Sequence, residues 1–228
     1  MPLYNEEKTL AKSVKTVVNF LADTNFPYPY TLTLANNAST DKSWKVCLEC
    51  ANAFPQVRAI DIGKKGKGLA IRTAWSKSES DFLVFMDCDL ASDLLFLRPL
   101  VEEVIANGAH LAIGNRHGRE SRIVSRHPIR KIASHIFNLS ARILLKTPFA
   151  DHQCGFKAMS KKAFDAIEGQ LNEEGWLFDA ELLAHSVRRG YSVASVDIVW
   201  KEGEESKVSL FSDSIKMFGD LFSLHRRI

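Results

Sequence analysis

Two aspartates follow directly on an apolar run in the middle of the chain. The segment DFLVFMD, residues 81–87, is apolar almost throughout, and Asp87 and Asp89 stand at its end with Cys88 between them. Two carboxylates so spaced at a strand end can bind a hard divalent cation and leave coordination positions for phosphate oxygens. Acids at strand ends also form ordinary turns. The neighbouring segments are therefore needed to choose between a cation site and a turn.

Glycines and basic residues lie on both sides of this pair. The run GKKGKGLA, residues 63–70, places Lys67 and Gly68 at a predicted helix start, where backbone N–H groups favour an anion. Arg116 and Arg130 follow in the segments GNRHGR and RHPIRK, and arginine clusters suit a diphosphate. Each segment alone would also fit a solvated basic loop, but together with the acids they indicate a site for a metal and a phosphorylated ligand.

Alternating strands and helices must position these residues. Strands are predicted at 30–37, 57–63, 81–87 and 109–116, and helices at 6–23, 39–54, 66–78 and 91–108. This alternation predicts a parallel sheet with helices on both faces, whose ligands gather at the carboxyl ends of the strands. Strand 81–87 is the most apolar, and we expect it to be central.

The second half alternates less regularly. Helices are predicted at 127–146, 160–169 and 176–190, strands at 155–160 and 191–200, and residues 212–228 predict an amphipathic helix with a basic end. Without an internal repeat or linker, residues 1–228 are expected to form one domain. The loop PLYNEE resembles one that follows the first strand of such a fold, yet only Met1 precedes it. We therefore expect that first strand to be absent, or its place in the sheet to be taken by another segment.

Composition narrows the class of protein. Thirty basic and 27 acidic residues give a net charge of +3, which gives little support to a nucleic-acid partner. The four cysteines are predicted to be buried thiols in a reducing compartment, because CLEC has no second pair for a zinc site. The N-terminal sequence has no signal-peptide pattern, and no apolar run reaches membrane-spanning length.

Seven short motifs occur in an order that resembles a known family. They are PLYNEE, NNASTD, KGKGLA, MDCDL, GNR, DHQCGF and a late SK pair. This order is similar to that of the inverting nucleotide-sugar glycosyltransferases of glycosyltransferase family 2, of the dolichyl-phosphate sugar synthase type. The segments DHQCGFKAM, GWLFDAELL and VDIVWKEGEESK resemble the dolichyl-phosphate β-glucosyltransferase branch and its polyprenyl-phosphate relatives. The resemblance spans nearly the whole chain and implies the Rossmann-like GT-A fold, with a mostly parallel central sheet flanked by helices.

The resemblance also implies a donor site. The expected nucleotide-sugar contacts are Pro2, Tyr4, Glu6, Asn37, Lys67, Gly68, Asp87 and Cys88. Asn37 stands where the family carries an acid that contacts the base, so the base is less certain. Asp87 and Asp89 are the implied ligands of a Mg²⁺ or Mn²⁺ cofactor, with Asp89 favoured as the direct ligand.

The remaining matches imply catalytic and acceptor residues. Asp151, Arg116 and Arg130 are the expected catalytic residues, with Arg126 as the alternative to Arg130. Ser134 and Lys207 are expected at the acceptor phosphate. We expect Asp151 to orient the acceptor or to stabilise positive charge at the anomeric carbon, and to act as a base only as second choice.

The resemblance implies transfer of a hexose, glucose from UDP-glucose being favoured over mannose from GDP-mannose, onto a polyprenyl or dolichyl phosphate. Transfer to a glycan or cell-wall acceptor, or nucleotide-sugar binding with weakened catalysis, are the alternatives. Residues 127–146 and the C-terminal helix could lie at a membrane surface or pack on the core. We expect a peripheral protein on the cytoplasmic face of the membrane, anchored by a membrane partner protein or a further segment.

Overall fold

The computed structural model describes residues 1–124, 128–201 and 212–228. The strands are β1 (Pro2–Leu3), β2 (Leu32–Asn36), β3 (Val57–Asp61), β4 (Phe82–Met86), β5 (Leu111–Asn115), β6 (Arg122–Ile123), β7 (Phe156–Ser160), β8 (Val193–Asp197) and β9 (Val199–Trp200). The helices are α1 (Leu10–Asp23), α2 (Ser43–Ala53), α3 (Lys67–Ser76), η1 (Leu94–Phe96), α4 (Leu97–Ile105), α5 (Pro128–Leu145), α6 (Lys161–Asp165), η2 (Glu168–Gln170), α7 (Phe178–Arg188) and α8 (Ser212–Arg227). The predicted alternation of strands and helices is confirmed.

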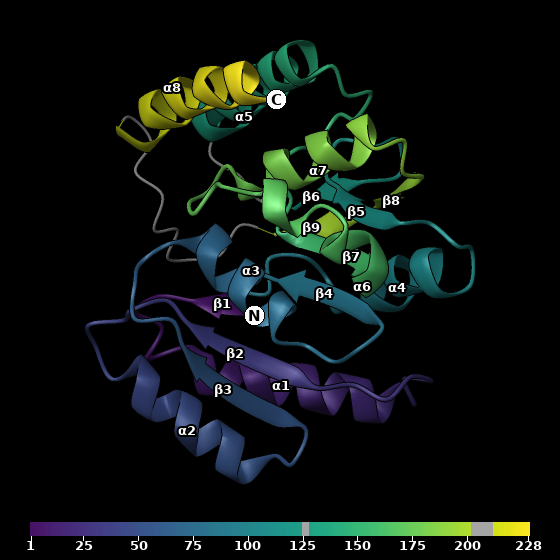
Figure 1. Ribbon diagram of the computed structural model, residues 1–228. Coiled ribbons are helices and arrows are strands. Elements are labelled where there is room, and N and C mark those ends of the chain that lie inside the picture. Colours follow the sequence, from purple (N-terminus) through teal and green to yellow (C-terminus); the bar gives the residue numbers. More distant parts are fainter. Residues whose placement is uncertain (125–127, 202–211) are drawn as a thin grey trace.

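The strands form three hydrogen-bonded groups flanked by helices (Figure 1). One sheet is parallel, in the order β1-β2-β3, and a second has the order β4-β7-β5-β8. In the second sheet β5 and β8 are parallel, whereas β7 runs antiparallel to both of its neighbours. A short parallel pair, β6 and β9, lies beside it. The α/β architecture is therefore as predicted, with one reversed strand.

Two expectations about the middle of the sheet are corrected. The position of the first strand is filled by Pro2 and Leu3, which pair with β2. Strand β4, predicted to be central, stands at the edge of its sheet and bonds to β7. Strand β1 bonds only to β2, and buried side chains, not a backbone ladder, lie between β1 and β4.

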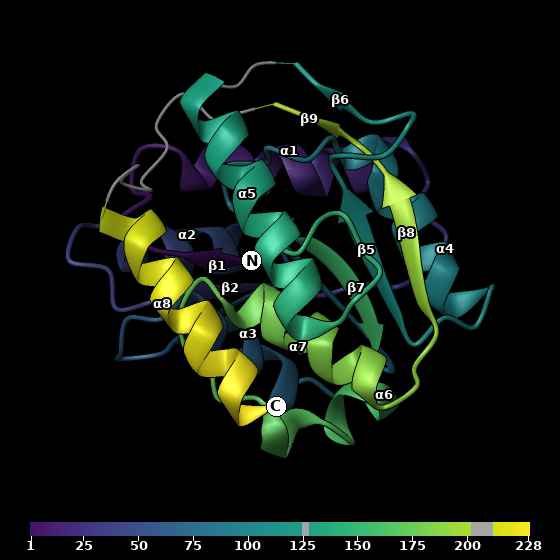
Figure 2. The ribbon, with the colours of Figure 1, turned by 90° about the horizontal axis from the view of Figure 1, so that it is seen from above.

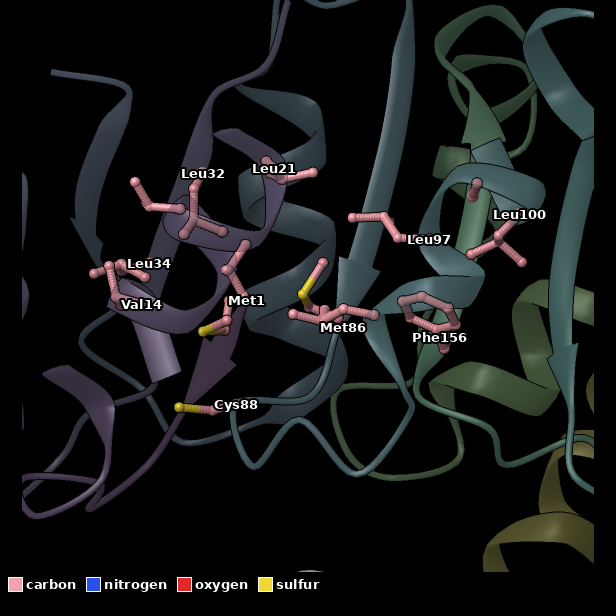
Figure 3. Packing of buried hydrophobic residues seen from close by; sticks show 14 of the residues in the cluster. Met1, Val14, Leu21, Leu32, Leu34, Met86, Cys88, Leu97, Leu100 and Phe156 are labelled. Atoms are coloured by element: carbon pink, nitrogen blue, oxygen red, sulfur yellow. The ribbon is translucent and has the colours of Figure 1, made fainter. Parts of the chain in front are cut away.

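Buried side chains join the two sheets into one core where no backbone ladder connects them. Met1 lies in one buried cluster with Met86 and Cys88, and Figure 3 shows these side chains between the two sheets. The same cluster includes the buried face of α1, which carries Leu10, Val14, Val17, Val18 and Leu21, and, through Phe156, strand β7. All four cysteines are buried free thiols, as predicted from their spacing.

Helices α5 and α8 pack on each other and cover the top of the molecule (Figures 1 and 2). The rings of Phe137 and Phe218 meet with centroids 5.7 Å apart, and Ala141, Leu145, Leu221 and Leu224 are buried around them. Seen from above, α5 crosses the molecule over α7 (Figure 2), and the two helices share one buried cluster. Among the described helices, none is both long and apolar enough to cross a bilayer.

Candidate active site

The two aspartates at the end of β4 differ in surroundings. The Asp87 side chain is 37% exposed, and its Oδ1 lies 2.8 Å from the Lys67 ammonium. Asp89 lies in an exposed turn, where its Oδ1 accepts a bond from the Ala91 N–H at 3.1 Å. Partial desolvation, and next the neighbouring charge of Asp87, raise the pKa of Asp89 above its ordinary value. A cation bound between the two carboxylates would relieve that repulsion.

These residues fit a divalent cation as a partial coordination shell. Within the described residues, no cluster of three or more His, Cys, Asp or Glu side chains is arranged to hold a metal. Two carboxylates suffice for a cation of the Mg²⁺ type, which usually takes its other ligands from water and substrate phosphates. The Cys88 side chain turns into the core (Figure 3), so a contact to a nucleotide there would come from its backbone.

Lys67 begins α3 and is almost enclosed, at 9% exposed. Its ammonium lies 2.8 Å from Asp87 Oδ1, 3.4 Å from Asp179 Oδ2 and 5.2 Å from the centroid of the Trp176 ring. Burial alone would lower the pKa of Lys67, but the carboxylates of Asp179 and Asp87 outweigh it and raise this pKa. The Lys67 side chain therefore remains protonated and carries a positive charge beside Asp87.

The backbone N–H groups at the start of α3 were expected to bind an anion, but two of them are already hydrogen-bonded within the protein. The N–H groups of Gly68 and Leu69 donate to the carbonyls of Gly175 and Glu174, at 3.2 and 3.1 Å. A Cβ on Gly68 would approach the Glu173 carbonyl and the Phe178 Cβ to 2.5 Å, so this glycine permits close packing. The positive charge offered to a ligand here comes from lysine side chains.

Arg116 and Asp151 form a two-pronged ion pair at the end of β5. Arg116 Nε donates to Asp151 Oδ2 and Nη2 to Oδ1, each at 2.7 Å, and the Arg116 N–H adds a third bond at 3.0 Å. Both side chains are buried, and the guanidinium lies 5.5 Å from the centroid of the Trp200 ring. Burial alone would raise the pKa of Asp151, but Arg116 holds it well below the ordinary range. Asp151 is thus ionised and a weak base, which opposes the second-choice role as general base.

The N-terminal loop meets the ends of β2 and β3. The backbone N–H groups of Asn5 and Glu6 donate to Ser39 Oγ and Ser43 Oγ, and the Lys65 ammonium lies 4.0 Å from the centroid of the Tyr4 ring. Asn37 Oδ1 accepts from the Gly66 N–H at 2.5 Å. Tyr4, Glu6 and Asn37 therefore lie around one edge of this site, while Pro2 is buried in β1. Their contact with a nucleotide sugar stays a prediction.

Next to Asn37, the Asn36 amide donates to Asp61 Oδ1 at 2.8 Å. The buried Oδ1 of Asn36 has no hydrogen-bond partner among the described residues. This is a polar environment at the strand ends, where the family's nucleotide base was expected.

The acceptor residues are only partly described. Ser134 is buried on the inner face of α5, where it accepts from Asn138 Nδ2 at 3.4 Å, and Asn138 Oδ1 accepts from the His152 N–H at 2.8 Å. Arg130 lies half-buried one turn before Ser134. Lys207, and Arg126 as the alternative to Arg130, lie outside the described residues.

His152, next to Asp151, is too enclosed to contact a phosphate. Its ring is fully buried against Thr147 Oγ1, at 2.5 Å from Nε2. Burial lowers the pKa of His152 to about 4, so the ring is neutral near pH 7.

Comparison with known proteins identifies the family. Residues 1–168 match the family described as Glycosyl transferase family 2. The chain belongs to that family. It is 30% identical over 218 residues to the glycosyltransferase AglD of Haloferax volcanii, a match that covers 95% of this chain and 35% of AglD. The chain therefore spans about a third of the length of AglD.

A second relative is more evenly covered. Identity to the dolichyl-phosphate beta-glucosyltransferase of Saccharomyces cerevisiae is 28% over 239 residues, or 97% of this chain and 71% of the yeast protein. Among solved structures, glucosyl-3-phosphoglycerate synthase of Mycobacterium tuberculosis in complex with Mn²⁺ and UDP-glucose superimposes with a TM-score of 0.69 at 18% identity. The superposition covers 99% of this chain and 77% of that one. The GT-A-like fold expected for a family 2 glycosyltransferase is confirmed.

Two buried residues beside this family 2 site, Lys157 and Asp179, were not predicted from the sequence. Lys157 lies fully buried in β7, where its ammonium donates to Asp179 Oδ1 and to the Cys154 carbonyl, both at 2.6 Å. Asp179, at the start of α7, lies between two buried lysines, Lys67 and Lys157. The one available signal was a lysine inside the otherwise apolar segment GFKAM.

Gly155 lies directly against Asp87. Its carbonyl accepts from the Asp87 N–H at 3.1 Å, and a Cβ at this glycine would fall 1.9 Å from Asp87 Oδ2. Glycine at this position therefore leaves room for the carboxylate.

We expect Gly155→Ala to displace the Asp87 carboxylate and to weaken Mn²⁺ binding at least about tenfold. Titration of free Mn²⁺ by electron paramagnetic resonance measures this. Gly169→Ala is the matched control, since a Cβ there would meet nothing within 4 Å. Equal Mn²⁺ affinity in Gly155→Ala and wild type would contradict the role of Gly155.

We expect Arg116→Met to lower the free energy of unfolding by about 3–5 kcal/mol, because it leaves the buried Asp151 carboxylate without its partner. The double variant Arg116→Met/Asp151→Asn should recover much of this loss in denaturant unfolding. Arg98→Ala breaks an exposed ion pair with Glu102 and should leave the unfolding midpoint nearly unchanged. A similar midpoint for Arg98→Ala and Arg116→Met would show that the buried pair contributes no more than the exposed one.

Proposed function

We propose that this domain transfers a hexose, with glucose from UDP-glucose favoured, onto a polyprenyl phosphate of the dolichyl type, with inversion and with a divalent cation. The observation that carries the proposal is the meeting of Asp87, Asp89, Lys67 and the Arg116–Asp151 pair at the ends of β4 and β5. Such an edge of an α/β sheet is where nucleotide ligands bind.

The relatives support the choice of substrates. The yeast relative, and similar proteins of Mus musculus and Drosophila melanogaster, are named dolichyl-phosphate beta-glucosyltransferases. The mycobacterial enzyme that shares the fold is described in complex with Mn²⁺ and UDP-glucose. A cation at Asp87 and Asp89 would neutralise the diphosphate of such a donor.

In the proposed reaction, a phosphate oxygen of the acceptor attacks the anomeric carbon from the side opposite the diphosphate. The new carbon–oxygen bond forms as the bond to the diphosphate breaks, and the nucleoside diphosphate leaves with the electron pair. An α-linked donor then gives a β-linked product. The acceptor phosphate is already ionised, so no base has to remove a proton from it, which agrees with the lowered pKa of Asp151.

The residues of this chain would supply charge and position. Lys67 places a positive charge beside Asp87, where the diphosphate would arrive. Arg116 neutralises Asp151, so that this carboxylate would not repel an incoming phosphate. Arg130, Ser134 and Lys207 are proposed to offset the repulsion between the two phosphate groups.

Labelled UDP-glucose or GDP-mannose, each with Mn²⁺ or Mg²⁺ and a short polyprenyl phosphate, tests the proposal. We expect lipid-soluble label with UDP-glucose only. Asp89→Ala should reduce metal-dependent turnover at least about a hundredfold, while Glu79→Ala, which removes another exposed acid, should not. Label in a water-soluble glycan, or tight nucleotide binding without turnover, would replace the proposal by one of the two alternatives.

The outer face of α5 supports a membrane-bound acceptor. Ile129, Ile132, Ile136, Leu139 and Ile143 recur every three or four residues and are each 52–66% exposed. The helix contains Arg130, Lys131 and Arg142, and no acidic residue. An apolar stripe with basic flanks suits the surface of an anionic bilayer. Because the inner face of α5 contacts His152 through Asn138, a bilayer on the outer face would lie one helix away from Asp151.

We expect the double variant Ile132→Glu/Ile136→Glu to lose binding to phosphatidylglycerol-containing vesicles in cosedimentation. Leu48→Glu on α2 changes another exposed leucine and should bind as wild type does. If the double variant binds vesicles as well as wild type does, the outer face of α5 is not the membrane-binding surface. A change of oligomeric state without loss of vesicle binding would assign the stripe to a second copy of the chain.

A further inference from the structure

Four charged side chains form a line from the core to the aspartate pair. Lys157 lies 2.6 Å from Asp179 Oδ1, Asp179 Oδ2 lies 3.4 Å from Lys67, and Lys67 lies 2.8 Å from Asp87 Oδ1. The charges alternate in sign along the line. Its inner members come from β7 and α7 and its outer members from α3 and the end of β4.

Only the outer end of this line reaches solvent. Lys157 is 0% exposed and Asp179 is buried, whereas Asp87 is 37% exposed. The ring of Phe85 lies 5.7 Å from the Lys67 ammonium and 5.6 Å from that of Lys157, which encloses both. Lys157 and Asp179 therefore act on a ligand only through Lys67 and Asp87.

Stability alone gives little reason for such a line. The cost of removing charges from water often equals or exceeds the attraction between them, and apolar side chains of similar volume frequently stabilise a core as well or better. A buried series of ions that ends at a ligand-binding carboxylate points instead to a role in placing charge at that carboxylate.

Lys67 has two carboxylate partners, and they are not equivalent. It is closer to Asp87 than to Asp179, by 2.8 Å against 3.4 Å. A lysine ammonium is a compact charge on a flexible stem with donors that can turn from one acceptor to the other. A divalent cation at Asp87 would repel Lys67, so binding is easier if Lys67 has another acceptor to turn to.

We propose that Asp179 and Lys157 are positioning residues that set the affinity of the Asp87–Asp89 pair for a divalent cation. Asp179 gives Lys67 a second counter-ion, to which it turns when the cation arrives. Lys157 pairs with Asp179 from the other side and limits how strongly Asp179 draws Lys67 away from Asp87. The inference rests on the cation of the proposed function and goes beyond it by assigning control of its affinity to two buried residues.

The two substitutions have opposite expected effects, which a merely structural role would not produce. Asp179→Asn leaves Lys67 with Asp87 as its only carboxylate along this line and adds one positive charge, so Mn²⁺ affinity should fall by about fivefold or more. Lys157→Met removes a positive charge and frees Asp179 to draw Lys67 inward, so Mn²⁺ affinity should rise by a similar factor. The double variant has the net charge of wild type and should fall between Asp179→Asn and wild type.

The measurement is titration of the whole chain with Mn²⁺ alone, followed by electron paramagnetic resonance of the free ion. Because neither donor nor acceptor is present, failure of glucose transfer does not affect the result. Thermal unfolding first shows which variants are folded at the assay temperature. Should Asp179→Asn not fold, Lys157→Met against wild type decides.

Opposite shifts in the two single variants, or tighter binding in Lys157→Met where it alone is folded, support the inference. Shifts in the same direction, no shift, or no Mn²⁺ binding by wild type overturn it. Lys161→Met serves as a matched control, since it removes a lysine that pairs with Asp165 at the surface and should leave Mn²⁺ affinity unchanged.

Discussion

The site depends on the requirement that a buried charge have a partner. Lys67, Lys157 and Arg116 are enclosed, and so are Asp151 and Asp179, with Asp87 and Asp89 at the outer edge. These three cations and four carboxylates have a net charge of −1. The excess negative charge lies at the solvent-accessible end, at Asp87 and Asp89. A divalent cation would turn this charge from −1 to +1, which then attracts a diphosphate.

Side-chain packing beside β4 supports the segment that carries the two aspartates. Strand β4 bonds to β7 on one side only, and Met1, Met86 and Cys88 pack together on the side toward β1 (Figure 3). The side chain of Cys88 is buried in this core, whereas Asp87 is 37% exposed and Asp89 lies in an exposed turn. Packing of Cys88 in the core thus anchors the chain between the two aspartates.

Local pattern was enough to predict the order of elements and the residues at strand ends, because both depend on periodicity along the chain. Pairing between distant segments was not predictable in this way. Arg116 and Asp151 were both singled out, yet their ion pair joins residues 35 positions apart. Lys157 was missed because a single lysine in a strand is normally exposed. The occupied N–H groups of α3 depend on where residues 174 and 175 return to the site.

The state of Asp151 favours a phosphate acceptor over a sugar hydroxyl. A hydroxyl must lose a proton as it attacks, which needs a nearby base with a pKa not far from 7. Asp151 is a weak base because Arg116 lowers its pKa, and His152 is buried with its ring against Thr147. An ionised phosphate needs no such base, but it does need protection from negative charge. In the proposed reaction the Arg116–Asp151 pair would supply that protection, since Arg116 cancels the carboxylate charge that would otherwise repel the acceptor.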